Sequence, residues 1–244
     1  MAALSIAAML SLWFSQCSRE SFFRDYFQRE PLAQTGTAVT AVSLLTWGMV
    51  RRLCHAGADL LLVHAGQLRQ EPAPASFAEL EELFRQGWSL VLRACERQDT
   101  GLAMLTRAFA AEIEGDVSIQ IYATPAKAQG FGWHYDFEDV FIAQSTGSKT
   151  YFLRRNTINP EPTRDAMPRE MGYERETGPI FSSTLQAGDA LYIPRGWWHA
   201  ARADETSLSM SVGVASPAAW GKSSAVDPAV GSVASVRPCR CTPS

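Results

Sequence analysis

The sequence Trp133-His134-Tyr135-Asp136 places an imidazole and a carboxylate two residues apart. In a β-strand, residues i and i+2 point to the same face, so His134 and Asp136 would project together while Tyr135 turns away. One imidazole and one carboxylate are two of the three ligands in the 2-His-1-carboxylate triad that binds non-haem Fe(II). An H-x-D triplet also arises by chance, and its weight depends on the structural setting.

A third ligand must come from a distant part of the chain, and the choice of histidines is small. The chain has four: His55, His64, His134 and His199. His199 follows a glycine turn, the apolar run at residues 190–193 and a proline-glycine bend, so it opens the next strand. His55 follows a helix end, where imidazoles often face carbonyl dipoles, and His64 ends a strand-like run; a structural or surface role is favoured for both. The predicted metal ligands are therefore His134, Asp136 and His199.

The region around these residues has the pattern of a β-rich domain. We expect strands at residues 117–122, 190–193 and 207–212, where apolar and polar residues alternate or form short apolar runs. We expect a hairpin in which residues 140–143 and 150–153 flank the turn Thr146-Gly147-Ser148. Such short strands with Gly and Pro between them predict a mainly β barrel or sandwich. The polar, proline-containing residues 156–179 are expected to form a long loop near the barrel mouth.

The chain divides into three predicted regions. Residues 1–115 are expected to be a helical region with one or two strands, packed on a barrel core formed by residues 116–215. Its predicted helices are 21–27, 44–54, 77–84 after a Ser76 N-cap, and 102–114, and its clearest predicted strand is 88–93. Residues 216–244 are rich in Ser, Ala, Gly, Pro and Val and are expected to be a poorly ordered tail.

Composition narrows the class of protein. With 244 residues, of which 46% are hydrophobic, the chain can bury a sizeable core. A net charge of −3 with mixed signs argues against a dedicated nucleic-acid binder. The five cysteines are Cys17, Cys54, Cys95, Cys239 and Cys241. Their odd number and scattered spacing favour a reducing, cytoplasmic setting. The apolar N-terminal run has no basic residue before it and is too short to span a membrane, so a packed helix is expected.

The combined motifs also match a known pattern. They are Tyr122-Ala123-Thr124-Pro125-Ala126, Gln129-Gly130, His134-Tyr135-Asp136, Val140-Phe141-Ile142, Gln144, Gly147, Lys149, Gly188-Asp189, Tyr192-Ile193-Pro194-Arg195-Gly196 and His199, together with FFRDYFQREPL at residues 22–32. Over about residues 20–214 the chain resembles the JmjC/cupin-type Fe(II)- and 2-oxoglutarate-dependent oxygenases, most of all the ribosomal-protein hydroxylases. The resemblance implies a double-stranded β-helix (a cupin or jelly-roll barrel) with N-terminal helical decoration. It also implies that His134, Asp136 and His199 are the iron ligands.

The resemblance further implies a binding site for the cosubstrate. Lys149, fifteen residues after His134, is expected to pair with the distal carboxylate of 2-oxoglutarate. Independently, Lys149 opens a predicted strand and can point into the barrel, where a buried lysine needs an anionic partner. Without the iron motif, a solvent-exposed lysine at a turn would be the simpler interpretation. By alternation, Tyr122 and Thr124 share a face with Gln120, and all three are predicted cosubstrate contacts.

Two positions depart from the family pattern. Gln120 stands where the family usually has Asn, and it keeps the amide with a longer reach. Gly213 stands where relatives carry Ser or Asn near the cosubstrate. We expect this glycine to lose a hydrogen bond to the cosubstrate or to let water replace it.

These residues predict a 2-oxoglutarate-dependent dioxygenase that hydroxylates an amino-acid side chain in a protein, a peptide or a peptide-derived natural product. Two alternatives stay open: a metal-dependent cupin enzyme that works without 2-oxoglutarate, and a non-catalytic cupin binding module. The first typically has more histidine ligands and no matching lysine. An intact triad together with Lys149 disfavours the second.

The partners follow less directly from the sequence. The ribosomal group carries a helical dimerisation region and a winged-helix segment after the barrel, where here we expect only a weakly structured tail. A ribosomal substrate is therefore not implied, and a smaller protein or peptide is considered. We expect no nucleic-acid or membrane partner, and we consider a homodimer.

Overall fold

Two antiparallel β-sheets form the framework of the computed structural model, which describes residues 9–72, 74–168 and 172–220. The larger sheet contains, in spatial order, β1 (Leu32–Gln34), β9 (Ala190–Ile193), β6 (Asp139–Thr146), β11 (Ser207–Ala215), β5 (Asp116–Thr124), β4 (Ser89–Arg93), β2 (Asp59–His64) and β3 (Gln67–Leu68). The smaller sheet contains β10 (Trp198–Ala203), β7 (Lys149–Arg154) and β8 (Phe181–Leu185).

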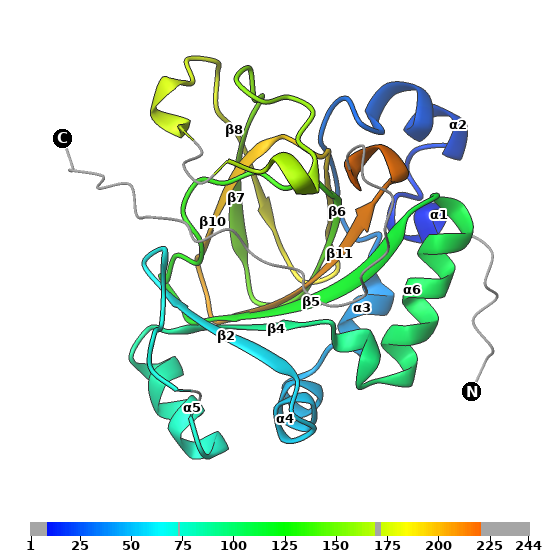
Figure 1. The fold of residues 1–244 in the computed structure, drawn as a ribbon. Helices are drawn as coiled ribbons and strands as arrows, with labels where there is room; N and C mark the ends of the chain where they lie inside the picture. The colour runs from blue at the N-terminus through cyan, green and yellow to red at the C-terminus, as the bar shows by residue number, and fades with distance from the viewer. Residues whose placement is uncertain (1–8, 73, 169–171, 221–244) are drawn as a thin grey trace.

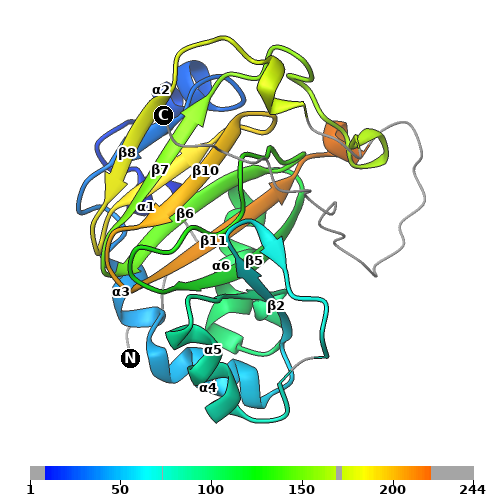
Figure 2. The same ribbon diagram turned by 90° about the vertical axis from the view of Figure 1, so that its left-hand side faces the viewer.

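The two sheets face each other (Figure 2). They enclose an apolar cluster, in which Val140 and Ile142 of β6 pack with Tyr151 and Leu153 of β7. A sheet pair of this kind directs the inward-facing side chains of several strands toward one chamber. The arrangement confirms the predicted mainly β, double-stranded β-helix fold.

Helices lie on the outer side of the larger sheet (Figure 1). They are α1 (Met9–Trp13), α3 (Val39–Leu44), α4 (Trp47–His55), α5 (Phe77–Arg85) and α6 (Thr100–Glu112). Phe141 of β6 is the centre of this second core, because its ring lies 5.1 Å from Phe109 of α6 and 6.1 Å from Phe14. The predicted N-terminal helical decoration is therefore present and supplies most of the apolar contacts outside the barrel.

Alternation along β5 separates the two faces of the larger sheet. Ile119 and Ile121 are fully buried on the side that the helices cover. Gln120 and Tyr122, which point to the interior of the barrel, are only partly buried. Because successive side chains of a strand point to opposite faces, the helices bury one face and leave the other free for polar groups.

The N-terminal region contributes four strands, more than the one or two expected. β1 pairs with β9 at one edge of the larger sheet. β4 pairs with β5, and β2 and β3 continue the sheet to its other edge. The first 115 residues therefore extend the sheet at both edges as well as covering its outer face.

Helix boundaries differ from prediction where a capping residue intervenes. The predicted helix at 44–54 is two helices, because Thr46 stops α3 and caps α4. Its Oγ1 accepts a hydrogen bond from the Met49 amide at 3.2 Å. Two further predicted helices are confirmed as α5, capped by Ser76, and α6, capped by Asp99.

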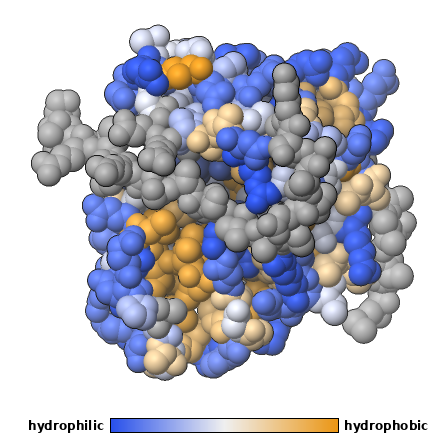
Figure 3. Space-filling view, viewed as in Figure 1, coloured by the Kyte–Doolittle hydropathy of each residue, from blue (hydrophilic) through white to orange (hydrophobic). Residues whose placement is uncertain are grey.

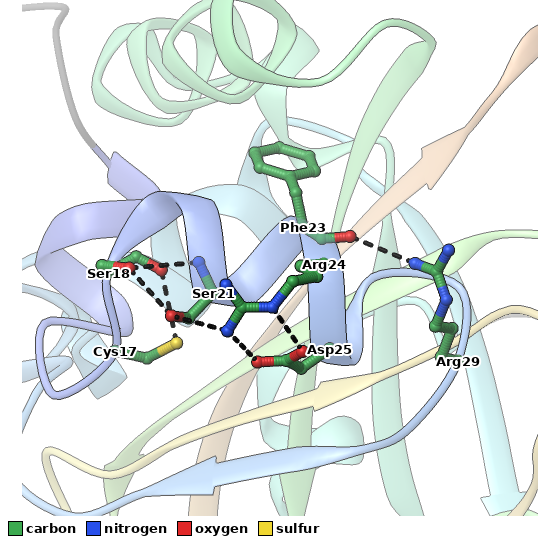
Figure 4. Close-up of polar contacts among 7 residues, drawn as sticks. All are labelled: Cys17, Ser18, Ser21, Phe23, Arg24, Asp25 and Arg29. Atoms are coloured by element: carbon green, nitrogen blue, oxygen red, sulfur yellow. Dashed lines mark hydrogen bonds and ion pairs between the residues drawn. The ribbon is translucent and has the colours of Figure 1, made fainter.

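The segment before β1 is shaped by local polar contacts (Figure 4). Ser18 caps the single-turn helix α2 (Arg19–Ser21). A π-helical turn (Phe22–Tyr26) follows in place of the regular helix expected there. Arg24 and Asp25 form an exposed ion pair at 2.8 Å, which contributes little to stability.

The predicted hairpin at residues 140–153 is wrong. β6 pairs with β11 and β9 in the larger sheet, whereas β7 pairs with β10 and β8 in the smaller one. The turn between them therefore carries the chain from one sheet to the other. Gly147 has φ +64°, and a Cβ atom there would lie 2.2 Å from the Thr206 carbonyl oxygen. Only glycine fits this corner without displacing the neighbouring chain.

The region after β7 contains the predicted long loop. It holds two short 3-10 helices, Arg164–Ala166 and Tyr173–Arg175. Edge strand β8 follows and was missed, because its Ser-Ser-Thr centre lacks an apolar alternation. Of the expected tail, Pro217–Trp220 forms a 3-10 turn, and residues 221–244 lie outside the described residues.

A groove lies on the surface between α4 and α5. Hydrophobic side chains reach the surface in the lower half of the molecule, where α4, α5 and β2 lie (Figure 3). The groove between the two helices is lined by Trp47, Phe77 and Phe84. Among the described helices, none combines the length and the apolar character that crossing a membrane requires.

Candidate metal and cosubstrate site

His134 and His199 are joined backbone to backbone at one end of the barrel. The His134 amide donates to the His199 carbonyl at 3.1 Å, and the His199 amide donates to the His134 carbonyl at 2.8 Å. His134 forms an isolated bridge to β10, so the strand predicted around it is wrong. Asp136 nevertheless lies beside both imidazoles, and Tyr135 is buried, with its hydroxyl in contact with Asn159.

His134, Asp136 and His199 form a compact group of potential metal ligands. Their ligand atoms lie within 4.8 Å of one another, and His199 Nε2 is 3.4 Å from Asp136 Oδ2. It is the only such group of His, Cys, Asp and Glu within residues 9–72, 74–168 and 172–220. Two imidazoles and a carboxylate on one face fit non-haem Fe(II) and leave coordination positions for a bidentate ligand and O₂.

Backbone carbonyls orient both imidazoles. His134 Nδ1 donates to the Gly132 carbonyl at 2.8 Å, and His199 Nδ1 donates to the Trp197 carbonyl at 3.0 Å. A carbonyl can only accept, so Nδ1 of each ring carries a proton, and Nε2 is the ring nitrogen left to act as a metal ligand. Such contacts fix the tautomer and the ring orientation of metal-binding histidines.

The electrostatics suit metal binding. Burial, with repulsion from His199, lowers the pKa of His134 to about 4, so this imidazole is neutral at neutral pH. Burial alone would raise the pKa of Asp136, but its hydrogen bond with His199 and the two imidazoles hold that pKa below its usual range. Burial would lower the pKa of His199, yet the same contact with Asp136 raises it. An ionised carboxylate beside neutral imidazole is the form that binds a cation.

Lys149 lies deep in the barrel. It is 4% exposed, and its Nζ donates to Thr124 Oγ1 at 3.2 Å. Nζ also lies 5.2 Å from the ring centroid of Tyr122 and 5.8 Å from that of Tyr151. Burial lowers the pKa of Lys149 to about 8. Among the residues that the structure describes, no carboxylate lies within ion-pair distance of this ammonium group.

The predicted cosubstrate contacts Gln120, Tyr122 and Thr124 share the inner face of β5, as their alternation requires. The Tyr122 hydroxyl donates to Gln120 Oε1 at 2.9 Å, so the carbonyl oxygen of that side-chain amide is already hydrogen-bonded. Ser207 of β11 pairs in register with Thr124, and its buried hydroxyl has no hydrogen-bond partner in the described part of the chain. A buried ammonium group beside an unsatisfied hydroxyl fits an anionic ligand such as a dicarboxylate.

Tyr151 and Ser207 were missed by sequence reasoning. Tyr151 lies two residues after Lys149 on β7, so alternation alone could have placed it on the same face. The Ser207-x-Ser209-x-Ser211 pattern of β11 carries the same signal for that strand.

The histidines assigned no metal role lie elsewhere. The His55 ring stacks on Phe77 at 5.8 Å. His64 Nδ1 contacts the Gly87 carbonyl at 3.1 Å, and its ring lies 5.3 Å from Trp88. Neither belongs to the metal-ligand group.

Aromatic residues brace the segments that carry the ligands. The Trp133 ring stacks on Tyr173 at 4.3 Å and 9°. Trp198 is fully buried, lies edge-on to Tyr135 at 4.6 Å, and donates from Nε1 to Glu176 at 2.8 Å. Trp133 and Trp198 therefore hold the loop after β7 against the metal-binding segments, and Trp198 serves as core.

Glu138 is a further group near the site that sequence reasoning missed. A Cβ atom on Gly213 would lie 2.3 Å from Glu138 Oε2, so the carboxylate occupies the space that a side chain of β11 would fill. The expectation that water replaces a side chain at Gly213 is thus corrected, because Glu138 fills that position. Burial and the nearby Asp136 raise the pKa of Glu138 to about 8.

Comparison with known sequences agrees with this geometry. Residues 101–220 match the model of the JmjC domain family. The bifunctional lysine-specific demethylase and histidyl-hydroxylase NO66 of Dictyostelium discoideum is 34% identical over 144 residues, which are 57% of this chain and 27% of that protein. Ribosomal oxygenase 2 of Bos taurus is 27% identical over 251 residues, covering 89% of this chain and 50% of that protein. The chain thus spans half or less of the length of these relatives.

Solved structures show the same fold. The crystal structure of the Escherichia coli ribosomal oxygenase YcfD superposes with a TM-score of 0.61 and 22% identity, covering 93% of this chain and 63% of that one. A structure of YcfD in complex with cobalt and 2-oxoglutarate gives a TM-score of 0.60 at 22% identity, covering 92% and 62%. Residues 101–220 of this chain therefore match the JmjC domain family, and the chain shares the fold of these solved structures.

Proposed function

We propose that the protein is an Fe(II)- and 2-oxoglutarate-dependent dioxygenase that hydroxylates an amino-acid side chain in a protein or peptide. The observation that carries the proposal is Lys149, a buried cation without a carboxylate partner in the described residues, on the same barrel as the three metal ligands. In register, Lys149 pairs with Ala203 of β10 and Leu153 pairs with His199. Lys149 and the metal ligand His199 are thus four residues apart along the paired strands, which is roughly 13 Å.

Each part of the site has a role in this proposal. His134, Asp136 and His199 would hold the metal, and Lys149, Thr124 and Ser207 would bind the distal carboxylate of the cosubstrate. When bound, ferrous iron would supply the chemistry for hydroxylation of a C–H bond, with O₂ as the oxidant and 2-oxoglutarate as the co-reductant that is converted to succinate and CO₂. The rings of Tyr122 and Tyr151 exclude water around Lys149, which strengthens its attraction for an anion.

The substrate class is part of the same proposal. The names of the relatives refer to hydroxylation of histidyl residues and to ribosomal oxygenation, which supports a protein or peptide substrate. The alternative is a smaller substrate, a peptide-derived natural product. We also propose a cytoplasmic setting, in which the free thiols of Cys17, Cys54 and Cys95 stay reduced. Two expectations stay predictions: that the protein binds no nucleic acid, and that it can form a homodimer.

Calorimetric titration of 2-oxoglutarate into Mn(II)-loaded protein tests the cosubstrate site. Lys149→Met is expected to weaken binding on the order of 100-fold, because it removes a charge-assisted contact in a buried site. Lys127→Met is the matched control, because Lys127 is exposed. Equal binding by the Lys149→Met variant would contradict the role of Lys149 as the cosubstrate contact. No binding by the Mn(II)-loaded wild type would contradict the proposal and favour a cupin enzyme that works without 2-oxoglutarate.

Succinate formation tests the reaction itself. We expect release of succinate from 2-oxoglutarate that requires added Fe(II) and is abolished in Asp136→Ala. Binding of metal and 2-oxoglutarate with no succinate over a broad peptide panel would instead indicate a non-catalytic binding module.

A further inference from the structure

The segment before β1 lies beside the turn that precedes the metal ligand His199. Residues 28–31 lead directly into β1, where Leu32 pairs with Tyr192 of β9. Because β9 ends at Ile193, the turn at residues 194–197 follows immediately. The pairing of β1 with β9 therefore brings the segment and the turn together, although 168 positions separate Arg29 from Trp197 in the sequence.

A buried carboxylate joins the segment to the turn. Asp139, at the start of β6, is 1% exposed and lies on the outer face of the larger sheet, away from the metal ligands. It accepts hydrogen bonds from Gln28 Nε2 at 3.2 Å, from the Tyr192 hydroxyl at 2.5 Å and from the Arg195 amide at 3.4 Å. The Gln28 amide also donates to the Tyr192 hydroxyl at 2.7 Å. Asp139 therefore holds Gln28 and Arg195 at one point.

Trp197 joins the same segment to the turn at a second point. Its Nε1 donates to the Arg29 carbonyl at 3.1 Å. The guanidinium carbon of Arg155 lies 5.3 Å from the Trp197 ring centroid, and Arg155 forms an ion pair with Glu30. The Arg29 guanidinium donates to the Phe23 carbonyl at 3.1 Å, which ties the segment back to the π-helical turn (Figure 4). The Trp197 indole is thus held in one orientation.

The turn contacts both segments that carry metal ligands. The Gly196 amide donates to the Asp136 carbonyl at 2.8 Å, and the Trp197 carbonyl accepts a hydrogen bond from His199 Nδ1 at 3.0 Å. Gly196 has φ +79°, and a Cβ atom there would overlap the Pro160 carbonyl oxygen, so the loop after β7 packs closely on the turn. Contacts of this kind around metal-binding histidines typically change metal affinity by about 10–100-fold.

Resting on the proposed function, we infer that residues 28–30 form a clamp that positions His199 for the metal, and that Trp197 is the positioning residue through which the clamp acts. The Arg29 carbonyl holds the Trp197 indole, and the Trp197 carbonyl holds the His199 imidazole. Asp139 fixes the same turn through the Arg195 amide. Without the clamp, the turn would lose its outer partner, and the imidazole would adopt orientations that suit the metal less well.

Calorimetric titration of Mn(II) into the metal-free protein tests the clamp without turnover. Trp197→Phe removes the indole N–H but keeps an aromatic ring, and we expect it to weaken Mn(II) binding roughly tenfold. The visible absorption spectrum of the Co(II)-loaded protein depends on the arrangement of the ligands, so it should change as well. Gln28→Gly removes the side-chain amide and tolerates the φ of +57° at this position. It should weaken Mn(II) binding several-fold.

Two control variants separate positioning from a general loss of stability. Asp99→Ala removes the cap of α6, on the outer side of the larger sheet. It should lower the urea unfolding midpoint of the metal-free protein but leave the Mn(II) affinity and the Co(II) spectrum unchanged. Trp47→Phe alters a tryptophan of α4 that is 41% exposed, and it should change neither metal readout. If Trp197→Phe does not fold, Gln28→Gly takes its place with the same readouts.

The inference and the proposed function fail in different ways. Wild-type Mn(II) affinity and an unchanged Co(II) spectrum in Trp197→Phe, or an equal loss of affinity in Asp99→Ala, would overturn the clamp. Weaker metal binding in Trp197→Phe, with no Fe(II)-dependent succinate release by the wild type, would overturn the proposed reaction and leave the clamp standing. Succinate release by the wild type together with unchanged metal binding in Trp197→Phe would do the reverse.

Discussion

Glu176 shows how one buried carboxylate can position a metal-binding strand. It accepts hydrogen bonds from Trp198 Nε1 at 2.8 Å and from the amide and hydroxyl of Thr157, both at 2.8 Å. Trp198 directly precedes the ligand His199, so Glu176 connects the loop after β7 to β10. Hydrogen bonds to a charged acceptor are stronger than neutral ones.

Glu176→Gln is expected to destabilise the fold by about 2 kcal/mol. The carboxylate accepts all of its hydrogen bonds with two oxygens, whereas the glutamine amide would point an N–H donor at one of the N–H or O–H donors around it. Urea unfolding followed by tryptophan fluorescence measures the change. Glu174→Gln, at an exposed position two residues away, should change stability by less than about 0.5 kcal/mol. Equal stability of the Glu176→Gln variant and wild type would refute the anchoring role.

The same residue gives a pH dependence. Burial acts to raise the pKa of Glu176, but the hydrogen bonds from Trp198, Thr157 and Ile158 outweigh it and hold the pKa below the ordinary value of 4.5. The unfolded chain therefore binds more protons in acid, so the stabilisation is complete above about pH 4.5 and is lost as pH falls through the lower folded value. Unfolding curves between pH 6 and pH 3 should show wild type converging on Glu176→Gln.

Predictions from the sequence were most successful for individual residues. His134, Asp136 and His199 could be predicted because their chemistry and order suffice to suggest a triad. The position of the Glu138 carboxylate could not be predicted, because it depends on the absence of a side chain at Gly213, 75 residues later in the chain. No local pattern relates these two positions.

At the scale of elements, Gly147 forms the corner between the two sheets. Gly147→Ala is expected to destabilise the protein by roughly 3 kcal/mol, from the positive φ and the contact with the Thr206 carbonyl. Gly130→Ala is the matched control, because no atom lies within 4 Å of a Cβ there. Thermal unfolding of both variants measures the difference. Similar melting temperatures would show that the corner relaxes easily.

The start of α6 offers a second prediction for an element. Asp99 Oδ1 accepts hydrogen bonds from the amides of Gly101 at 2.8 Å and Leu102 at 3.1 Å. Asp99→Ala should cost about 1 kcal/mol of stability, whereas Asp99→Asn, which can still cap, should cost less than half of that. Chemical denaturation checks both. A loss of equal size in the two variants would mean that charge, including the Arg52 contact at 3.9 Å, matters more than capping.

At the scale of the whole molecule, the metal should stabilise the fold, since its ligands come from the segment before β6 and from β10. At a Mn(II) concentration 100 times its dissociation constant, the gain is about 2.7 kcal/mol, or roughly 5–10 °C in melting temperature for a chain of this size. EDTA should reverse the shift, and Asp136→Ala should show none. A shift of the same size in Asp136→Ala would place the metal elsewhere.

The sequence by itself determined the chemistry of the site and the class of fold. The H-x-D pattern followed from strand alternation, and the distant His199 followed from ligand chemistry and the small number of histidines. Lys149 was assigned through the resemblance of the combined motifs to a known family. The Ser76 cap of α5 and most strands were readable from local patterns.

Only the tertiary structure decided which strands pair and which side chains face each other across the chamber. Residues 140–153 look like a hairpin locally, yet β6 and β7 belong to different sheets, because β6 pairs with β11 and β9, and β7 pairs with β10 and β8. The strands of the N-terminal region, the edge strand β8, the position of Ser207 beside Lys149 and that of Glu138 on Gly213 depend on the same long-range packing. Ligand chemistry and motif resemblance therefore predicted the metal ligands and the place of Lys149, and packing between distant segments set the surroundings in which they lie.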